Sequence, residues 1–544
     1  MKRIITIIIV WVAVLGLQAQ VVESIRIYTD KECYLAGEYL WIKVCVTDSL
    51  LRESKLSKVA YIEVGDTKQV YAQGKINLQD GNGWGRIKLP QTMHTGAYQL
   101  TAYTRYMRNG TEDDFSKKYI ALLNTFQATE EDDVKLITDT LSKVSSNQSG
   151  LSTRLLTDKP IYGNRSKVTL VLPKLPADIK EMSVSVVRKD CKLSGFPVMS
   201  NNGENGNHIP NRHFIAECEG HIVTGKLIGE TANSVNAQLS CIGKDIRIFD
   251  GQPQSDSIYV FYTAGLTDMQ EIVLTALPEK ESTCRLEIVS PFAGIVPQAL
   301  PKLRLSIQED ALIERSFGAQ LHPILPFDSI HKQSILNQLH DFVPVSTYNL
   351  DEYTRFNKVR ELFTEFITGI RISKLEDKNI LRILQSDIKQ FSNQKALVLL
   401  DGVPVEDHEA ILDYNSRLVH YIHRYTGKYT FGGELYDGIV SFVTHKGTMP
   451  DIRLDKNSQL FSYEFPQNRP AFIAPIYQTE EQINSRIPDF RHTLYWNPEV
   501  IPDSDGISFY TSDLDGIYSV VLQGISNDGK EVKIQSEFRV GKSH

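Results

Sequence analysis

The stretch TDKECYLAGEYLWIKVCVTD, residues 29–48, decides how the N-terminal part of the chain folds. Leu40, Ile42, Val44 and Val46 occupy alternate positions in it, which predicts a β-strand with one buried face. Other short alternating runs surround it, and glycine-rich turns such as DGNGWGRIKLP lie between them. Short strands at regular spacing with turn signals between them predict a β-sandwich over residues 21–128.

The hexapeptide at 29–34, TDKECY, has an echo at 157–162, TDKPIY, and a β-rich run follows each copy. We interpret the echo as two tandem β-sandwich domains of similar size. The acidic and then Ser/Asn/Gly-rich stretch at 129–150 is typical of a linker between them. The second region, 151–310, contains the polar loop NNGENGNHIPN and is either one domain or two small ones.

Residues 325–447 have a mixed α and β pattern. RFNKVRELFTEFI and NILRILQSDIKQF carry apolar residues at helical spacing. ALVLLDGVPVED, residues 396–407, predicts a buried strand, a turn at Asp401-Gly402 and a second short apolar step. We expect a linker at 448–488 and a C-terminal β-sandwich at 489–544. The predicted fold class is therefore mainly β and multidomain, with tandem Ig-like β-sandwiches and one small α/β domain.

The first twenty residues have the pattern of a secretory signal peptide. Lys2 and Arg3 precede an apolar run from Ile4 to Leu17, and small Ala19 lies near a plausible cleavage point. An uncleaved anchor is the alternative, although the apolar run is shorter than the roughly 20 residues of a spanning helix. We expect an exported protein, periplasmic or associated with the outer membrane, without a transmembrane segment of its own after cleavage.

Charge excludes some classes of partner. Without Lys2 and Arg3, 57 basic residues face 66 acidic ones, which argues against nucleic acid as a partner. The six cysteines form no C-x-x-C pair, so the pattern supports neither a zinc knot nor a redox motif. Disulfides are permitted in an exported chain, but burial as small apolar side chains is the favoured interpretation.

Two resemblances follow from these stretches. The first and last β regions resemble the macroglobulin-type sandwich through the 29–46 stretch, TGAYQLTAYTRYM and DGISFYTSDLDGIYSVVLQGIS. Residues 350–447 resemble the plug domain of TonB-dependent outer-membrane transporters through RFNKVRELFTEFITGIRI, ALVLLDGVPV and YTFGGELYDGIVSFVTHKG, in that order. The combination resembles a family of exported Bacteroidota proteins that carry macroglobulin-like domains around a plug-like domain and lack a barrel.

The plug resemblance singles out a set of positions with a structural role and a possible role in docking. They are Asp401, Gly402, Pro404, Tyr429, Gly432, Gly433, Gly438, Thr444 and Gly447. One departure is the basic, His-bearing segment SRLVHYIHRYTGKYT, where plugs carry an acidic strand. Contacts that a transporter plug makes with its barrel or ligand are therefore not carried over.

No catalytic, cofactor-binding or metal-binding residues are predicted. The C-G-E-Q thioester of covalent protease traps is absent, as are G-x-S-x-G, H-E-x-x-H and the P-loop pattern. LVHYIHRYT predicts a strand, on which His420 and His423 point to opposite faces and do not share a metal ion.

The sequence favours a non-enzymatic envelope scaffold or accessory protein. It would dock onto an envelope protein, with an outer-membrane barrel transporter as the candidate, through the plug-like domain. The alternative is a thioester-independent, macroglobulin-like protease inhibitor, for which the polar loops at 129–150 and 201–211 are the candidate bait segments.

Overall fold

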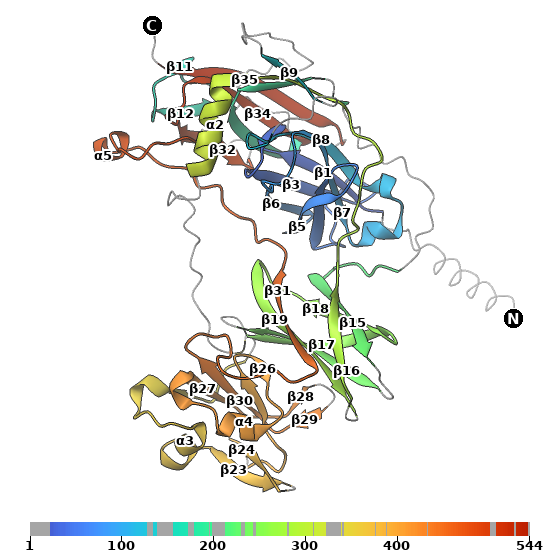
Figure 1. The fold of residues 1–544 in the computed structure, drawn as a ribbon, viewed down its shortest axis with the longest axis vertical. Coiled ribbons are helices and arrows are strands. Elements are labelled where there is room, and N and C mark those ends of the chain that lie inside the picture. Colours follow the sequence, from blue (N-terminus) through green and yellow to red (C-terminus); the bar gives the residue numbers. More distant parts are fainter. Residues whose placement is uncertain are drawn as a thin grey trace, which may run out of the picture. The chain divides into compact units, whose positions relative to one another are not determined.

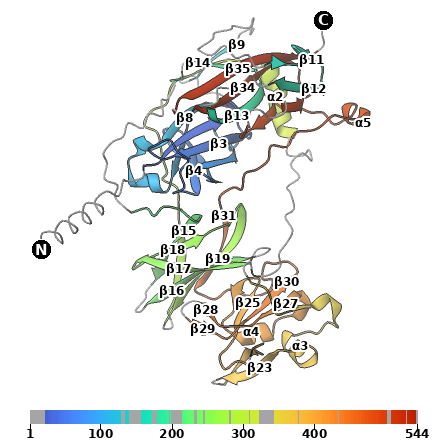
Figure 2. The ribbon, with the colours of Figure 1, turned by 180° about the vertical axis from the view of Figure 1, so that it is seen from behind.

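The chain of this computed structural model separates into two compact units (Figures 1 and 2). The first comprises residues 1–218, 292–329 and 466–544, and the second comprises residues 219–291 and 330–465. The structure describes residues 22–127, 134–138, 156–171, 179–194, 196–197, 213–229, 234–242, 246–279, 282–307, 309–321, 339, 342–375, 377–387, 389–431, 434–500, 507–526 and 529–541. The predicted signal peptide, the 201–211 loop, Gly432 and Gly433 lie outside these residues.

The first unit begins with the expected β-sandwich. One sheet has the order β1 (Ser24–Thr29), β3 (Tyr39–Thr47) and β6 (Asn82–Lys88). The facing sheet has the order β2 (Cys33–Leu35), β8 (Ser116–Leu123), β7 (Gly96–Thr104), β4 (Val59–Gly65) and β5 (Val70–Asn77). Two 3₁₀ turns, Tyr106–Asn109 and Glu112–Asp114, connect β7 to β8. The alternating side chains of β3 enter a single core, in which Leu40, Ile42 and Val44 are fully buried.

A second sandwich in the same unit is assembled from two segments that are far apart in the chain, 156–188 and 493–540. β10 (Leu156–Thr157), β12 (Lys167–Val171) and β33 (Ile507–Tyr510) form one sheet. The other has the order β11 (Ile161–Tyr162), β35 (Glu531–Val540), β34 (Gly516–Ser526), β13 (Ile179–Arg188) and β32 (Thr493–Asn497). This differs from the expected boundaries, because the strands of 489–544 complete the sandwich that 156–188 begins and do not form one of their own.

The hexapeptide echo corresponds to one repeated local structure. The hydroxyl of Tyr34 donates to Asp30 at 2.8 Å, and that of Tyr162 donates to Asp158 at 2.8 Å. The short strands that follow, β2 and β11, each pair in parallel with the last strand of their sandwich, β8 and β35. The two sandwiches therefore begin with the same turn and the same parallel pairing.

The first unit also contains α2 (Glu309–Leu321), α5 (Glu480–Ile483) and a small sheet. The sheet has the order β14 (Cys191–Ser194), β21 (Leu303–Ile307) and β9 (Val134–Thr138). β9 lies in the segment predicted as a linker, where it pairs in parallel with β21. The strand is short, and its partner lies about 170 residues further along the chain, so the local sequence pattern did not predict it.

The second unit contains a seven-stranded sheet. Its order is β20 (Cys284–Val289), β15 (His221–Gly229), β18 (Ile258–Thr263), β17 (Arg247–Ser255), β16 (Val235–Ile242), β19 (Met269–Pro278) and β31 (Ser458–Glu464). Leu286 and Tyr463, from strands at opposite ends of this order, share one core, so the sheet folds over on itself. The 151–310 region thus contributes to two domains, and the predicted linker at 448–488 supplies the last strand of this sheet.

The remainder of the second unit is the α/β domain, residues 342–449. Its sheet has the order β22 (Ser346–Asn349), β27 (Val419–Tyr425), β30 (Ile439–Thr444), β25 (Leu397–Leu400) and β26 (Val403–Pro404). The helices are α3 (Val359–Glu365) and α4 (His408–Leu412), with 3₁₀ turns at Leu350–Glu352 and Ser416–Leu418. Two hairpins complete it: β23 (Ile370–Leu375) with β24 (Lys378–Ile383), and β28 (Tyr429–Phe431) with β29 (Glu434–Tyr436).

The secondary-structure predictions for the α/β domain hold in part. The helix predicted in RFNKVRELFTEFI is α3, and the strand predicted in LVHYIHRYT is β27. The second helical prediction is wrong, because Lys378–Ile383 is strand β24. The mainly β, multidomain class is confirmed, and no helix among the described residues is long and apolar enough to cross a membrane.

Candidate functional sites

The turn after β25 is held together by a buried carboxylate. Asp401 is fully buried and accepts hydrogen bonds from the Thr444 amide at 2.7 Å, the Thr444 hydroxyl at 2.6 Å and the Met449 amide at 2.8 Å. The Gly447 amide donates to the Thr444 hydroxyl at 2.9 Å. Asp401 therefore ties the end of β25 to the turn that follows β30.

Two of the predicted glycines are required by close contacts. A Cβ on Gly402, which has φ +94°, would lie 2.6 Å from Ile246 and 2.9 Å from the Cys241 carbonyl oxygen. A Cβ on Gly438, with φ +101°, would lie 2.7 Å from Ile383 and 2.8 Å from the Tyr425 carbonyl oxygen. Both positions combine a backbone conformation that favours glycine with a space that no side chain fits.

Pro404 and Tyr429, two further positions of the plug-like set, also make contacts that support the fold. Pro404 lies in β26, opposite Leu399, and the Tyr429 hydroxyl donates to the Thr426 carbonyl at 3.0 Å. The structure brings Asp401, Thr444 and Gly447 into one network and leaves Gly438 and Tyr429 apart from it. The described members of the set stabilise turns and packing, and their role in docking stays a prediction.

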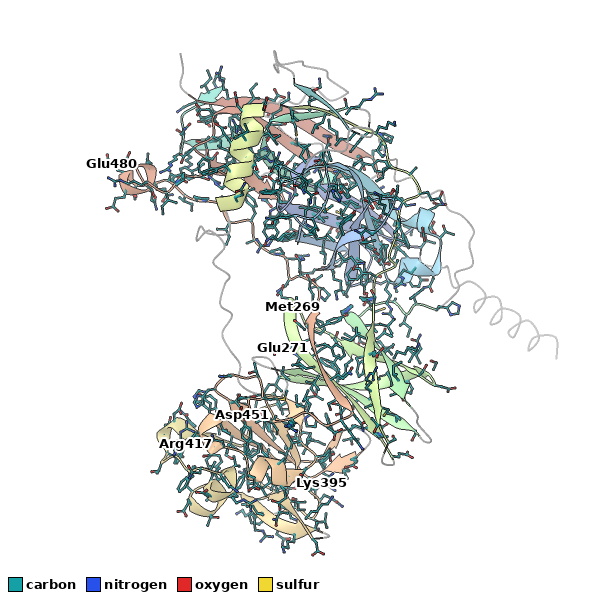
Figure 3. All side chains as sticks on the ribbon, in the orientation of Figure 1. Met269, Glu271, Lys395, Arg417, Asp451 and Glu480 are labelled. Carbon is teal, nitrogen blue, oxygen red and sulfur yellow. The ribbon has the colours of Figure 1, made fainter. Side chains whose placement is uncertain are left out.

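The surface of the α/β domain carries paired charges, among them that of Lys395, which is labelled in Figure 3. The Lys395 ammonium group lies 3.0 Å from Glu406 and 3.1 Å from Glu434. Arg360 likewise lies 2.9 Å from Glu409 and 2.7 Å from Asp413. These partly exposed pairs are worth little to stability and mark no ligand site.

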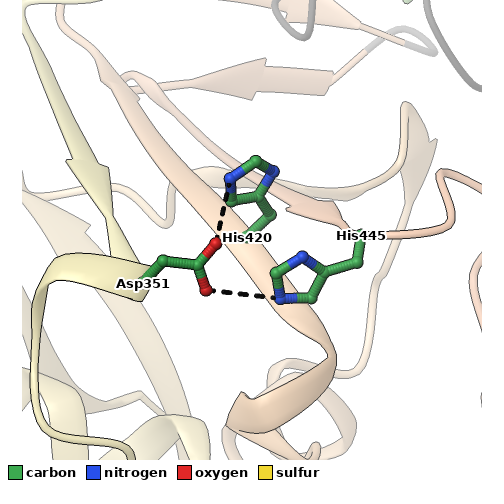
Figure 4. Close-up of side chains that lie close together, drawn as sticks. All are labelled: Asp351, His420 and His445. Carbon is green, nitrogen blue, oxygen red and sulfur yellow. Dashed lines mark ion pairs between the residues drawn. The ribbon is translucent and has the colours of Figure 1, made fainter.

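One side-chain cluster of a different kind lies in the same domain. Among the residues that the structure describes, Asp351, His420 and His445 form the one group of three potential metal ligands whose atoms all lie within 4.8 Å of one another (Figure 4). Burial is the main cause that lowers the pKa of both imidazoles. The neighbouring His445 lowers the pKa of His420 further, and Arg355 lowers that of His445 further. Sequence reasoning missed this group, because it compared His420 with His423 alone and did not consider Asp351 or His445.

The sequence argument about His423 itself holds. His423 is buried, and its Nδ1 lies 2.9 Å from the Thr347 hydroxyl, whereas His420 is directed to the cluster. The two histidines of β27 therefore do not share a ligand.

The first unit contains a charged cleft of about 240 Å³ between its two sandwiches. Arg315 of α2 is fully buried there and donates to Glu38 at 2.7 Å, to Asp190 at 3.1 Å and to the Cys33 carbonyl at 2.9 Å. His492 lies 2.9 Å from Asp190. Every hydrogen-bonding direction of the guanidinium is used, so the cluster joins α2 to both sandwiches and is structural.

The electrostatics of the cleft agree with that role. Burial alone would raise the pKa of Glu38 and Asp190. The Arg315 guanidinium, together with Lys31 for Glu38 and His492 for Asp190, outweighs burial and holds both pKa values well below their usual range. The same two carboxylates raise the pKa of Arg315, against the effect of its burial. All three groups are therefore charged at neutral pH.

These observations define a mainly β, multidomain protein with an α/β domain inserted between strands of one sheet. No family model matches the chain, and no curated protein matches it either. Matches among solved structures include native Escherichia coli alpha-2-macroglobulin, at 8% identity and a TM-score of 0.24, covering 95% of this chain and 40% of that one. The trypsin-activated form of Escherichia coli alpha-2-macroglobulin matches at 7% identity and a TM-score of 0.24, covering 96% of this chain and 42% of that one.

A third match is the Escherichia coli adhesin FdeC, at 10% identity and a TM-score of 0.16, covering 53% of this chain and 65% of that one. This chain spans about two-fifths of the length of the alpha-2-macroglobulin. Because all these TM-scores lie far below 0.5, the matches carry no inference about activity, substrates or partners.

Proposed function

We propose that the protein is an exported, non-enzymatic binding protein of the cell envelope, which docks onto another envelope protein through the α/β domain. An outer-membrane barrel transporter is the candidate partner. The observation that carries this proposal is an exposed apolar segment beside an edge strand. Phe342, Val343 and Val345 precede β22 and are 42%, 87% and 50% exposed.

The position of this segment favours a partner. β22 pairs with β27 on one side, and among the described residues no strand pairs with its other edge. Edge strands in soluble proteins are usually protected by charges, prolines or a covering element, because an open edge recruits further strands. Pro344 interrupts this segment, but the exposed apolar side chains on either side of it, next to an open edge, favour addition of a strand from a binding partner.

The buried plug-like residues support this assignment indirectly. Asp401 is fully buried and Gly402 is closely packed, so both act on the structure of the domain and neither is free to contact a partner directly. The signal peptide pattern and the plug resemblance supply the envelope location and the class of partner, and both belong to the proposal.

The test is crosslinking in intact cells with a tagged full-length chain, followed by mass spectrometry of what is captured. Point substitutions suit the test better than a deletion, because Ile242 and Val273 of the seven-stranded sheet share the core of the α/β domain and a deletion would expose them. We expect Val343→Glu combined with Val345→Glu to abolish capture of one envelope protein.

Leu50→Glu is the matched control, since Leu50 is 67% exposed and lies in the first unit. Capture that survives the double substitution, or capture of secreted proteases alone, would overturn the docking proposal.

A further inference from the structure

A β-bulge creates the arrangement of Asp351, His420 and His445. In the pairing of β27 with β30, Val419 lies opposite Thr444 and Tyr421 lies opposite Val443, so His420 is an extra residue without a partner of its own. Bulges of this kind redirect a side chain and are common next to functional sites. Here the bulge directs His420 toward His445, the residue that directly follows β30 (Figure 4).

The third member comes from the neighbouring strand. Asp351 lies in the 3₁₀ turn that directly follows β22, and β22 pairs with β27 so that Asn349 is opposite Tyr421. The turn therefore places the carboxylate over the two imidazoles. Three different segments, separated by up to about 90 residues, converge on one point at the end of the sheet.

The distances between the ligand atoms suit a small metal ion. The Nε2 atoms of His420 and His445 lie 3.3 Å and 3.6 Å from the two carboxylate oxygens of Asp351. A tetrahedral site with bonds of about 2.0–2.1 Å separates its ligand atoms by about 3.4 Å. The rings are nearly parallel, at 18°, with their centres 4.8 Å apart, so the imidazoles must rotate for both Nε2 lone pairs to point at one ion.

We propose that Asp351, His420 and His445 form a binding site for a divalent transition-metal ion of the zinc class, with water completing the coordination. Two imidazole nitrogens and one carboxylate favour Zn²⁺, Cu²⁺ or Ni²⁺ over Ca²⁺ and Mg²⁺, which prefer oxygen ligands alone. The site lies at the end of β22 away from the apolar segment 342–345, and a test by metal titration does not depend on the docking proposal.

Arg355 competes with the metal for this site. Its guanidinium forms an ion pair with Asp351 and lies 3.4 Å from Nε2 of His445. Its other terminal nitrogen donates to the Val419 carbonyl at 2.8 Å, which holds it beside the cluster. A metal ion must therefore displace this cation from Asp351, and removal of the arginine should strengthen metal binding.

The experiment is calorimetric titration of the full chain with ZnCl₂, supported by the visible absorption of Co²⁺ as a measure of tetrahedral coordination. We expect one site that His420→Ala and His445→Ala each weaken by about tenfold or more. Arg355→Gln should strengthen it several-fold. His94→Ala is the control, because His94 is exposed in the first unit and belongs to no such cluster.

The outcomes separate the possibilities. Absence of Zn²⁺ binding by the wild-type chain, or unchanged binding in the His420→Ala, His445→Ala double variant, would overturn the site. An affinity in Arg355→Gln equal to or below that of the wild type would overturn the competition. Far-ultraviolet circular dichroism of each variant shows whether lost binding reflects lost structure.

Discussion

Replacement of Arg315 by methionine removes the cation on which the joint between the two sandwiches depends. Glu38 and Asp190 are then left buried without their partner, and the Cys33 carbonyl loses its donor. Breaking one buried ion pair typically costs about 3–5 kcal/mol, because an uncompensated charge remains in the interior. We expect the first unit of Arg315→Met to lose about that much free energy of unfolding.

Tryptophan fluorescence during urea unfolding measures this loss in the right place. Trp41, Trp84 and Trp496 all lie in the first unit, and the remaining tryptophan, Trp11, lies in the predicted signal peptide. Arg52→Met is the control, since Arg52 is 69% exposed in its pair with Asp48 and such pairs contribute at most about 1 kcal/mol. A loss below about 1 kcal/mol in Arg315→Met would refute the reasoning.

The pH dependence gives a second check on the same cluster. The pKa values of Glu38 and Asp190 are depressed from ordinary values of 4.5 and 3.8. Depressed carboxylates stabilise the folded state fully above their unfolded pKa and lose that contribution as the pH falls toward the folded pKa. The difference in stability between wild type and Arg315→Met should therefore be largest near neutral pH and shrink as the pH falls below about 4.

Three further predictions concern single contacts. In Asp401→Asn, one acceptor oxygen replaces the two carboxylate oxygens that accept three hydrogen bonds. The second unit should therefore lose about 1–3 kcal/mol of its free energy of unfolding, measured by hydrogen exchange of the β30 amides. Unchanged exchange would contradict this. Gly402→Ala should destabilise the second unit more than Gly427→Ala, measured by urea unfolding followed by circular dichroism. Gly427 also has a positive φ, but the nearest neighbour of a Cβ there is 3.8 Å away. Equal effects of the two substitutions would show that the contact with Ile246 does not matter. The thiols of Cys33 and Cys191 are in hydrogen-bonding contact, so oxidised glutathione should convert them to a disulfide with release of two molecules of reduced glutathione. Mass spectrometry should detect the disulfide as a crosslinked peptide. Alkylation of both cysteines after this treatment would contradict the prediction.

Local patterns predicted the strands well. The period-two alternation of β3 places Leu40, Ile42 and Val44 in the sandwich core, although the residues between them are also buried. The Asp401-Gly402 turn has positive φ at both residues, as Asp and Gly permit. The repeated Thr-Asp-Lys turn was readable because its Tyr to Asp hydrogen bond joins residues only four apart.

Pairing between distant segments was not readable. β34 pairs with β13 across more than 300 residues, and β31 joins β19 across nearly 200. The alternating pattern of a strand does not indicate which other strand it pairs with, so the C-terminal strands were assigned to a separate sandwich. β24 has apolar residues that fit a helix, but its hairpin with β23, through Asp377 at φ +63°, decides its conformation.

The metal cluster shows the same limit at a functional site. Its three members are far apart in the sequence, and the bulge that turns His420 toward His445 leaves no mark in the local pattern. A strand prediction alone correctly separated His420 from His423 but gave no reason to connect His420 with Asp351.

The most direct test of the docking proposal is site-specific photo-crosslinking in living cells, with a photoreactive amino acid at Val343 and, as the control, at Leu50. Val343 is 87% exposed beside the open edge of β22, so a docked partner must cover it. The proposal predicts one envelope protein crosslinked through position 343 and absent from position 50. The same products from both positions, or none from position 343, would contradict it.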